Sequence, residues 1–470
     1  MSQFSQGSAI ADSSSKYFSD YIHGYMVFPR NILDFVDTPQ FQRLRDLKQL
    51  GTTQFVYPGA THSRFEHCMG VAHLGSQWME RFRIKQPELE ITDREVNAVT
   101  LAGLCHDLGH GPFSHVFDGG FMPRARPNHK WHHEDWSEMM LNHLVDENYV
   151  DIEAEDLALI RDLIQGRAPN EGGANAQYRY MFDIVSNERN SVDVDKGDYL
   201  QRDAYNVGIK TDFDFSRLIH FSRVANDQIC FQEKEVFNLY EMFHTRYSMF
   251  KRVYTHRVGK AIEHMFVDAL LEADQYLQIS ASVDDPADYL NMTDSIVKEI
   301  ERSKVPELEK SRSILRAVRK RNLYKFVDEV VIPQDIMAHL DKSRISPEEI
   351  ASCQSDGFPV TASDVIVDWV DIHYGLKNGN NPVEQTRFFS RWEADETFNI
   401  PRDKVSFMLP GQYKDNILRV YCRDPDQMYA VQNAFKRFKQ RSLPTSITVS
   451  AIPSIPSVDS PRKRRLIELS

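Results

Sequence analysis

The chain has 470 residues, of which 41% are hydrophobic and 26% are charged, and this balance is typical of a globular protein with room for more than one domain. Its 56 basic and 68 acidic residues give a net charge of −12. That charge excludes a uniformly basic surface for nucleic acid but allows a local basic pocket for a phosphorylated ligand. No apolar run reaches the about 18 residues of a membrane span. Five scattered cysteines without CxxC pairs predict a reducing compartment, so we expect an intracellular protein of the nucleus and/or cytoplasm, with no membrane partner.

The first part of the chain predicts a helical domain. Residues 1–15 are Ser-rich and polar, and they predict a disordered tail. From Tyr21 to about Asp274, apolar residues recur every three to four positions, as in amphipathic helices, and we expect the helical core to span residues 16–303. The clearest pattern runs from Glu235 to Leu271 and predicts one long helix. Helix ends are indicated by the sequence GHGP at 109–112 and by the Gly-rich stretch at 169–177.

Residues 304–450 have a mixed pattern. The stretches 364–374 and 416–422 are rich in β-branched residues and predict strands. The expected fold class is therefore mainly α, a helical core with a smaller α/β C-terminal lobe. Residues 451–470 are rich in Pro, Ser and basic residues, and they predict a disordered basic tail.

The histidines are clustered in one part of the sequence. Nine of the 17 lie between residues 62 and 133, and six of these lie between 106 and 133. Metal or phosphate chemistry accounts for such a density better than chance does. The adjacent His106 and Asp107 end an apolar helix that Gly109 and Pro112 terminate. Imidazole and carboxylate without thiolate favour Fe, Mn, Mg or Zn carrying bound water.

A second segment, residues 192–203, supports this interpretation independently. If it is helical, Asp195, Tyr199 and Asp203 recur at i, i+4 and i+8 and share one face. That face presents a metal ligand, a phenol and a second carboxylate in a line. Each of these residues alone is more often structural than functional, so the prediction depends on the set.

The ordered set His67, His106–Asp107 and Asp195 resembles the signature of HD-domain phosphohydrolases. Six separated words, at 37–51, 63–74, 104–118, 131–134, 192–203 and 238–246, occur in the order found in the SAM- and HD-domain deoxynucleoside triphosphate triphosphohydrolases. The resemblance runs from about residue 23 to residue 274 and continues more faintly through the C-terminal lobe. Only about twenty residues precede the HD-like region, so we expect no SAM domain in this chain.

This resemblance implies metal-dependent hydrolysis of dNTPs to deoxynucleoside and inorganic triphosphate, which would control cellular dNTP pools. A transition metal (Fe, Mn or Zn) would be held by His67, His106, Asp107 and Asp195, and Mg²⁺ would arrive with the nucleotide. His110 would donate the proton to the leaving group, Asp118 would orient it, and His133 would lie nearby as a relay. The implied substrate-binding residues are Gln49, Leu50, Arg64, His115, Lys196, Tyr199, Asp203, Arg246 and Tyr254.

Within that set, Tyr254 would exclude a 2′-hydroxyl, while Gln49 and Asp203 would read the 3′-hydroxyl. Arg246 lies eight positions before Tyr254 on the predicted long helix, so both can face one pocket. Gly197 departs from the bulky aromatic residue that the family pattern has at that position, which predicts different local packing.

The resemblance also implies a homotetramer assembled by GTP and dNTP activators between subunits. Lys16, Asp37, Gln42 and Arg45 match a guanine site, where a carboxylate accepts from N1–H and the 2-amino group. The residues that match a second, dNTP-type site are Asp214, Arg217, Lys234 and Asn238. At that site Gln232 and Asn399 stand where arginines are expected. Losing two guanidinium groups weakens the capture of a triphosphate, so we expect weaker or altered activation.

The tail sequence SPRKRR at 460–465 has two functional interpretations. Ser460 fits a proline-directed phosphosite, and the basic run fits a short nuclear-import patch. Two other functions remain open from the residues alone. One is an HD phosphohydrolase of nucleoside monophosphates or cyclic nucleotides, against which Tyr199, Asp203 and Arg246 argue. The other is a nucleic-acid-binding protein with a vestigial site; nucleic acid would otherwise be a secondary partner.

Overall fold

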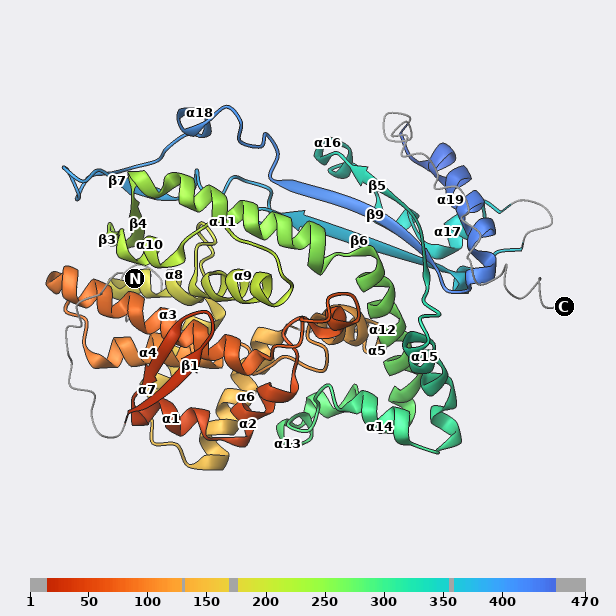
Figure 1. The fold of residues 1–470 in the computed structure, drawn as a ribbon, viewed down its shortest axis with the longest axis horizontal. Coiled ribbons are helices and arrows are strands. Elements are labelled where there is room, and N and C mark those ends of the chain that lie inside the picture. Colours follow the sequence, from red (N-terminus) through yellow and green to blue (C-terminus); the bar gives the residue numbers. More distant parts are fainter. Residues whose placement is uncertain (1–14, 129–131, 169–175, 355–358, 445–470) are drawn as a thin grey trace. The chain divides into compact units, whose positions relative to one another are not determined.

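The computed structural model of the protein describes residues 15–128, 132–168, 176–354 and 359–444 (Figure 1). Contacts divide the chain into two compact units, Met1–Phe326 with Asp371–Asp415, and Val327–Val370 with Asn416–Ser470. The tail expected at 451–470 and its Ser460 lie outside the described residues, as does nearly all of 1–15.

The first unit is mainly helical. It includes residues 304–326 and 371–415, which the sequence assigned to the C-terminal lobe: α15 packs on α12, and β7 pairs with β4. The helices of this unit are α1 (Arg30–Val36), α2 (Pro39–Gln42), α3 (Arg64–Lys85), α4 (Asp93–Cys105), α5 (Met122–Ala125), α6 (His133–Asn148), α7 (Ala154–Gln165), α8 (Phe182–Val185), α9 (Val194–Asn206), α10 (Phe215–His220), α11 (Val236–Met249), α12 (Arg257–Leu277), α13 (Pro286–Tyr289), α14 (Ile296–Arg302), α15 (Glu309–Arg319) and α18 (Arg402–Val405). Figure 1 shows α3 beside α4, and α3 also packs on α9.

Two small sheets accompany these helices. β1 (Lys16–Asp20) and β2 (Gly24–Phe28) form an antiparallel hairpin with Asp20 opposite Gly24 at its tip. A four-stranded sheet has the order β3-β4-β7-β8, with the parallel pair β4–β7 between two antiparallel pairs. Its strands are β3 (Ser222–Ala225), β4 (Gln228–Gln232), β7 (Arg387–Phe389) and β8 (Thr397–Phe398).

The second unit contains most of a three-stranded sheet of order β5-β9-β6 and its own apolar core. Its elements are β5 (Lys325–Ile332), α16 (Gln334–Met337), α17 (Pro347–Ala351), β6 (Val365–His373), β9 (Lys414–Cys422) and α19 (Met428–Ser442). The strands predicted at 364–374 and 416–422 correspond to β6 and β9. The fold is thus mainly α with a smaller α/β unit, as expected.

The single long helix predicted from Glu235 to Leu271 is wrong. The chain forms α11, then a π-helical turn at Phe250–Tyr254, and α12 begins only at Arg257. The Thr255 hydroxyl donates to the carbonyl of Phe250 (2.7 Å), and the His256 ring accepts from the first amides of α12. Helical periodicity alone cannot reveal such a break, because apolar residues continue at similar spacing through it.

Among the described residues, no helix is both long and apolar enough to cross a membrane. All five cysteines are buried and free.

Candidate active site

The ends of three helices bring the predicted metal ligands together. His67 lies in the first turn of α3, whose start is fixed by a capping box between Ser63 and Glu66. His106 is the C-cap of α4, and Asp107 follows it directly. Asp195 lies in the first turn of α9, behind the N-cap Asp193. These caps fix where each helix begins or ends and thereby place the four side chains.

The four side chains converge on one centre. His67, His106 and Asp107 each offer a ligand atom within 4.8 Å of the others. Asp195 Oδ1 lies 3.2 Å from His67 Nε2 and 3.6 Å from His106 Nε2. The exposed fraction of the side chain rises from 1% at His67 to 33% at Asp195, so the centre opens to solvent beside α9.

The hydrogen bonds on the far side of each ring favour metal binding. His67 Nδ1 lies 2.7 Å from a carboxylate oxygen of Asp198, and His106 Nδ1 lies 2.7 Å from the carbonyl oxygen of Gly103. Both partners are acceptors, so each Nδ1 carries the hydrogen and each Nε2 turns its lone pair toward the centre. His106 Nε2 is buried and has no hydrogen-bond partner. Two lone pairs and two carboxylates facing one point fit a divalent cation.

The electrostatics of the centre agree with that fit. Burial alone would lower the pKa of His67, but hydrogen bonds to Asp195 and Asp198 outweigh burial and raise it to about 10, so Nε2 binds a proton wherever it does not bind a metal ion. Burial would raise the pKa of Asp107, yet Arg64, His106 and His110 hold it well below its usual range. The surroundings therefore strongly favour positive charge at this point.

The turn that follows α4 is held by buried donors. The Arg43 guanidinium donates to the carbonyls of Leu108 (3.3 Å) and His110 (2.9 Å), and the Tyr289 hydroxyl donates to the carbonyl of Gly109 (2.7 Å). A Cβ at Gly109 would lie 2.2 Å from the carbonyl oxygen of His133, so only glycine allows the start of α6 to approach this closely. The close approach places His133 beside His110.

His110 is surrounded differently from the two ligand histidines. Its Nε2 lies 3.3 Å from Asp107 Oδ1, and its Nδ1 lies 3.2 Å from Asp118 Oδ2, although the latter contact lacks hydrogen-bond geometry. The ring is 2% exposed and stacks on His133, with centroids 4.2 Å apart. Since both ring nitrogens face carboxylates, this position suits an imidazolium, which is a proton donor and not a metal ligand.

The two stacked rings are driven to opposite protonation states. Burial and Arg64 lower the pKa of His110, but Asp118 and Asp107 outweigh them and raise it. Burial and the neighbouring His110 hold the pKa of His133 well below its usual range. A pair of groups with pKa values pushed apart is the arrangement that acid–base chemistry requires.

Two predicted phosphate contacts occupy contrasting positions. Arg64 is buried, ion-paired with Asp107, and donates from Nε to the hydroxyl of Ser114 (2.8 Å). His115 is 79% exposed, 3.5 Å from Asp118. Arg64 thus binds to protein groups of the centre, whereas His115 lies at the edge of the centre and is exposed to solvent.

The far end of the α9 face forms a second polar cluster. Asp203 accepts from the Tyr254 hydroxyl (2.7 Å) and contacts His62 Nε2 (2.7 Å). The ring of Tyr199 lies 6.4 Å from that of Tyr254. The backbone amide of Gln49 donates to the carbonyl of His62, and the side-chain oxygen of Gln49 is buried without a hydrogen-bond partner. Leu50 is half-buried against the core beside it.

Two further predicted substrate contacts are engaged with the protein. Lys196 Nζ pairs with Asp193 (2.8 Å) and is 14% exposed. Arg246 donates to the carbonyl of His373 and lies over the ring of Phe250, 4.3 Å from its centroid. Its Nε is buried and has no partner.

The ring of Phe215 explains why position 197 has no side chain. A Cβ at this position would lie 2.5 Å from Cε1 of Phe215, whose ring fills the space beside α9. The ring of Phe215, from α10, thus occupies the space that a side chain at position 197 would need.

The residues predicted for the guanine site lie near the N-terminal hairpin. Lys16 pairs with Asp37 at 3.2 Å, and both are about half exposed. Arg45 donates to the side-chain oxygen of Gln42 (2.8 Å) and lies 3.5 Å above the ring of Phe65.

The residues predicted for the second nucleotide site also lie close together. The side chain of Asn238 bonds both the amide and the carbonyl of Asp214, and it donates to Glu235 (3.1 Å). Arg217 pairs with the same Glu235, and Lys234 lies over the ring of Phe221. Of the two positions where arginine was expected, Gln232 ends β4, and Asn399 bonds Arg387 (2.6 Å) beside β7.

Sequence reasoning missed His62 and Asp198. His62 belonged to the histidine cluster but lies between the recognised words at 37–51 and 63–74, so only its contact with Asp203 assigns it. Asp198 lies three residues after Asp195 on α9, where a helical projection brings both carboxylates to the same neighbouring ring.

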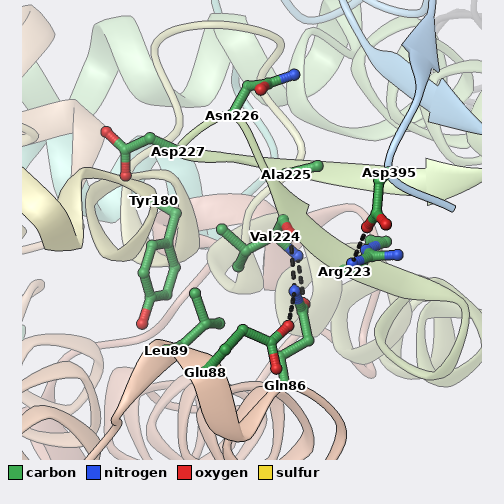
Figure 2. A pocket seen from close by; sticks show the side chains of 10 residues that line it. All are labelled: Gln86, Glu88, Leu89, Tyr180, Arg223, Val224, Ala225, Asn226, Asp227 and Asp395. Atoms are coloured by element: carbon green, nitrogen blue, oxygen red, sulfur yellow. Dashed lines mark hydrogen bonds and ion pairs between the residues drawn. The ribbon is translucent and has the colours of Figure 1, made fainter.

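A separate cavity of about 480 Å³ lies at the β3–β4 hairpin (Figure 2). Among its lining residues, the side chain of Gln86 bonds both the backbone amide and the carbonyl of Val224, and Arg223 pairs with Asp395. None of the predicted site residues lines it.

Comparison with known proteins identifies the family. A model described as the HD domain matches residues 64–201, and one described as the HD associated region matches residues 213–377. A Dictyostelium discoideum relative, named deoxynucleoside triphosphate triphosphohydrolase SAMHD1 homolog, is 48% identical over 427 residues, which cover 90% of this chain and 80% of the relative. The Homo sapiens deoxynucleoside triphosphate triphosphohydrolase SAMHD1 is 40% identical over 455 residues, covering 89% of this chain and 72% of the relative. This chain therefore belongs to the SAMHD1 family of HD-domain deoxynucleoside triphosphate triphosphohydrolases.

Proposed function

We propose that this protein hydrolyses dNTPs to the deoxynucleoside and inorganic triphosphate and thereby limits cellular dNTP pools. The observation that carries the proposal is the convergence of His67, His106, Asp107 and Asp195 beside the His110–His133 pair. Release of intact triphosphate requires attack at the α-phosphorus and departure of the sugar 5′-oxygen. A site for this reaction needs a cation, a proton donor and a pocket for the sugar in succession.

His67, His106, Asp107 and Asp195 would hold the transition metal, for which Fe, Mn and Zn all suit the imidazole and carboxylate donors. Such a metal lowers the pKa of a water ligand and polarises a phosphoryl oxygen, and Mg²⁺ would accompany the triphosphate. The chain's own contribution is to fix both imidazole rings and to keep both carboxylates ionised.

His110 would protonate the leaving 5′-oxygen. An alkoxide leaving group needs a general acid, and the two carboxylates that face the His110 ring stabilise its protonated form. Asp118 would hold the ring, and neutral His133, stacked on it, would pass on a proton.

Asp203, Tyr254 and Gln49 would receive the deoxyribose. The carboxylate and the unpartnered oxygen of Gln49 are acceptors suited to a 3′-hydroxyl, and the Tyr254 ring would block a 2′-hydroxyl. His115 and Lys196 would contact the phosphates, and the buried, unpartnered Nε of Arg246 would face the outer ones. Tyr199 would line the sugar pocket between the metal centre and Asp203.

Regulation forms the second half of the proposal. A homotetramer would bind GTP at Lys16, Asp37, Gln42 and Arg45, and a second nucleotide at Asp214, Arg217, Lys234 and Asn238. Nuclear import and phosphorylation at 460–465, and secondary binding of nucleic acid, are proposed from sequence alone.

An anion-exchange product assay tests the reaction. Purified protein is incubated with dATP and Mg²⁺, with and without GTP, beside Asp195→Ala and a matched control, Asp183→Asn, which alters a buried carboxylate of α8 outside the centre. Deoxyadenosine and inorganic triphosphate, absent with Asp195→Ala and retained with Asp183→Asn, are expected. Formation of dAMP, or no turnover under any condition, would refute the proposal and would direct attention to monophosphates.

A further inference from the structure

A buried charge cluster lies behind His67, on the side away from the metal centre. Asp198, from the middle of α9, is fully buried and accepts four contacts. His23 Nε2 (2.7 Å) and one Arg202 nitrogen (2.8 Å) meet its Oδ1. His67 Nδ1 (2.7 Å) and Arg202 Nε (2.9 Å) meet its Oδ2.

This arrangement requires a carboxylate and fixes the His67 ring. Each oxygen of Asp198 is met from both sides by donors, and an ionised carboxylate can only accept. Arg202 always donates, which keeps Asp198 ionised. Because Asp198 then accepts the hydrogen bond from the His67 ring, His67 Nδ1 must carry the hydrogen. The lone pair of Nε2 is then aimed at Asp107 and Asp195 (3.6 and 3.2 Å). A ligand ring held in this way binds metal more tightly than a free one, because outer hydrogen bonds set both its tautomer and its orientation.

The outermost part of this cluster comes from the N-terminal hairpin. His23 lies at the tip between β1 and β2, and Asp20 bonds the amides of Ile22 (2.9 Å) and His23 (2.8 Å), which fixes the turn. Asp20 also pairs with the fully buried Arg202 (2.8 Å). This tip lies outside residues 64–201, which match the HD domain.

The packing of α3 against the cluster is close. A Cβ at Gly70 of α3 would lie 1.9 Å from Asp198 Oδ1 and 2.7 Å from a nitrogen of Arg202. Glycine at this position lets α3 and α9 approach until Asp198 reaches His67. The ring is therefore held by α9, and α9 is held in turn by the hairpin.

We propose that Asp198, Arg202, Asp20 and His23 form a positioning network, and that the hairpin tip sets the metal affinity of the HD centre by fixing His67. The inference rests on the metal centre of the proposed function and not on the identity of the nucleotide.

Titration with Mn²⁺, followed by the electron paramagnetic resonance of the free ion, tests the network. Asp198→Asn is expected to weaken Mn²⁺ binding by about 10- to 100-fold, the usual effect of removing an outer partner of a metal-ligating histidine. An amide in place of the carboxylate turns an NH₂ toward a donor or reverses the His67 tautomer, which places a hydrogen on Nε2. His23→Leu is expected to weaken binding by about 10-fold, whereas His23→Gln, which retains a donor of similar reach, restores most of the affinity.

The controls separate this effect from loss of stability. Tyr25→Ala changes an exposed side chain of the same hairpin, and Asp183→Asn alters a buried carboxylate that pairs with Arg189. Both should bind Mn²⁺ like the unaltered protein. Unchanged affinity in Asp198→Asn and His23→Leu would overturn the network, and if Asp198→Asn fails to fold, the His23 pair decides. Absence of Mn²⁺ binding in the unaltered protein would count against the metal centre of the proposed function itself.

Discussion

The contact between Gly197 and Phe215 gives a prediction in which two opposing terms can be weighed. Alanine is favoured over glycine in a helix interior by about 1 kcal/mol. At position 197, however, the new Cβ would lie 2.5, 2.6 and 2.8 Å from three ring atoms of Phe215. Phe215 is 1% exposed and meets Trp78 edge-on at 5.7 Å, so it has little room to move. Overpacking of this kind costs about 1–3 kcal/mol.

Gly197→Ala should therefore lower the free energy of unfolding by up to about 2 kcal/mol, although it improves helix propensity. In a Phe215→Val background, where the three clashing ring atoms are absent, the same substitution should raise that free energy by about 1 kcal/mol. The difference between the two backgrounds is a coupling energy, measured by a double-mutant cycle.

Urea unfolding followed by tryptophan fluorescence provides the assay, because Trp78 packs against Phe215. Gly197→Leu in the same two backgrounds extends the series, with a larger coupling expected. A stabilising effect of Gly197→Ala in the unaltered background, or an equal effect in both, would refute the packing argument.

Three further predictions concern the pH dependence of stability, the choice between dATP and ATP, and activation by a dNTP. Burial, together with the neighbouring His23, lowers the pKa of His73 to about 4. The unfolded chain takes up this proton near pH 6.5 and the folded chain only near pH 4, so the free energy of unfolding has its full value above pH 6.5 and falls by about 3 kcal/mol as the pH drops to 4. His73→Leu should flatten this part of a plot of the free energy of unfolding against pH, and an unchanged slope would contradict the assignment. Tyr254→Ala should lower the ratio of kcat/KM for dATP over ATP by at least about tenfold, since each lost steric or hydrogen-bond discrimination is worth more than about 1 kcal/mol, whereas Tyr254→Phe should retain the ratio; equal ratios in the two variants would remove the ring as the 2′-hydroxyl barrier. Gln232→Arg with Asn399→Arg should lower the half-activating concentration of a dNTP by about tenfold or more, because each charge-assisted hydrogen bond contributes about 1.5–3 kcal/mol; activation that does not change would argue against a nucleotide at that position.

Local signals sufficed for much of the fold. The α4 helix ends where the GHGP sequence follows, α9 forms where its three chemical side chains share a face, and β6 and β9 form on the two β-branched runs. Each of these depends on neighbours within a few residues. The break between α11 and α12 was missed because a π-helical turn preserves the apolar spacing on both sides.

The residue types and spacing of the sequence by themselves predicted which side chains form the site, because a cluster of histidines and carboxylates at helix ends is a local pattern. Only the tertiary structure decided what each one contacts. Arg64, expected at the phosphates, is committed to Asp107, and His110 is distinguished from His67 by the carboxylates on both sides of its ring. Asp198 and His23, 175 positions apart, meet only in the folded chain. A hydrogen bond over such a separation depends on how helices pack, and no periodicity along the sequence encodes it.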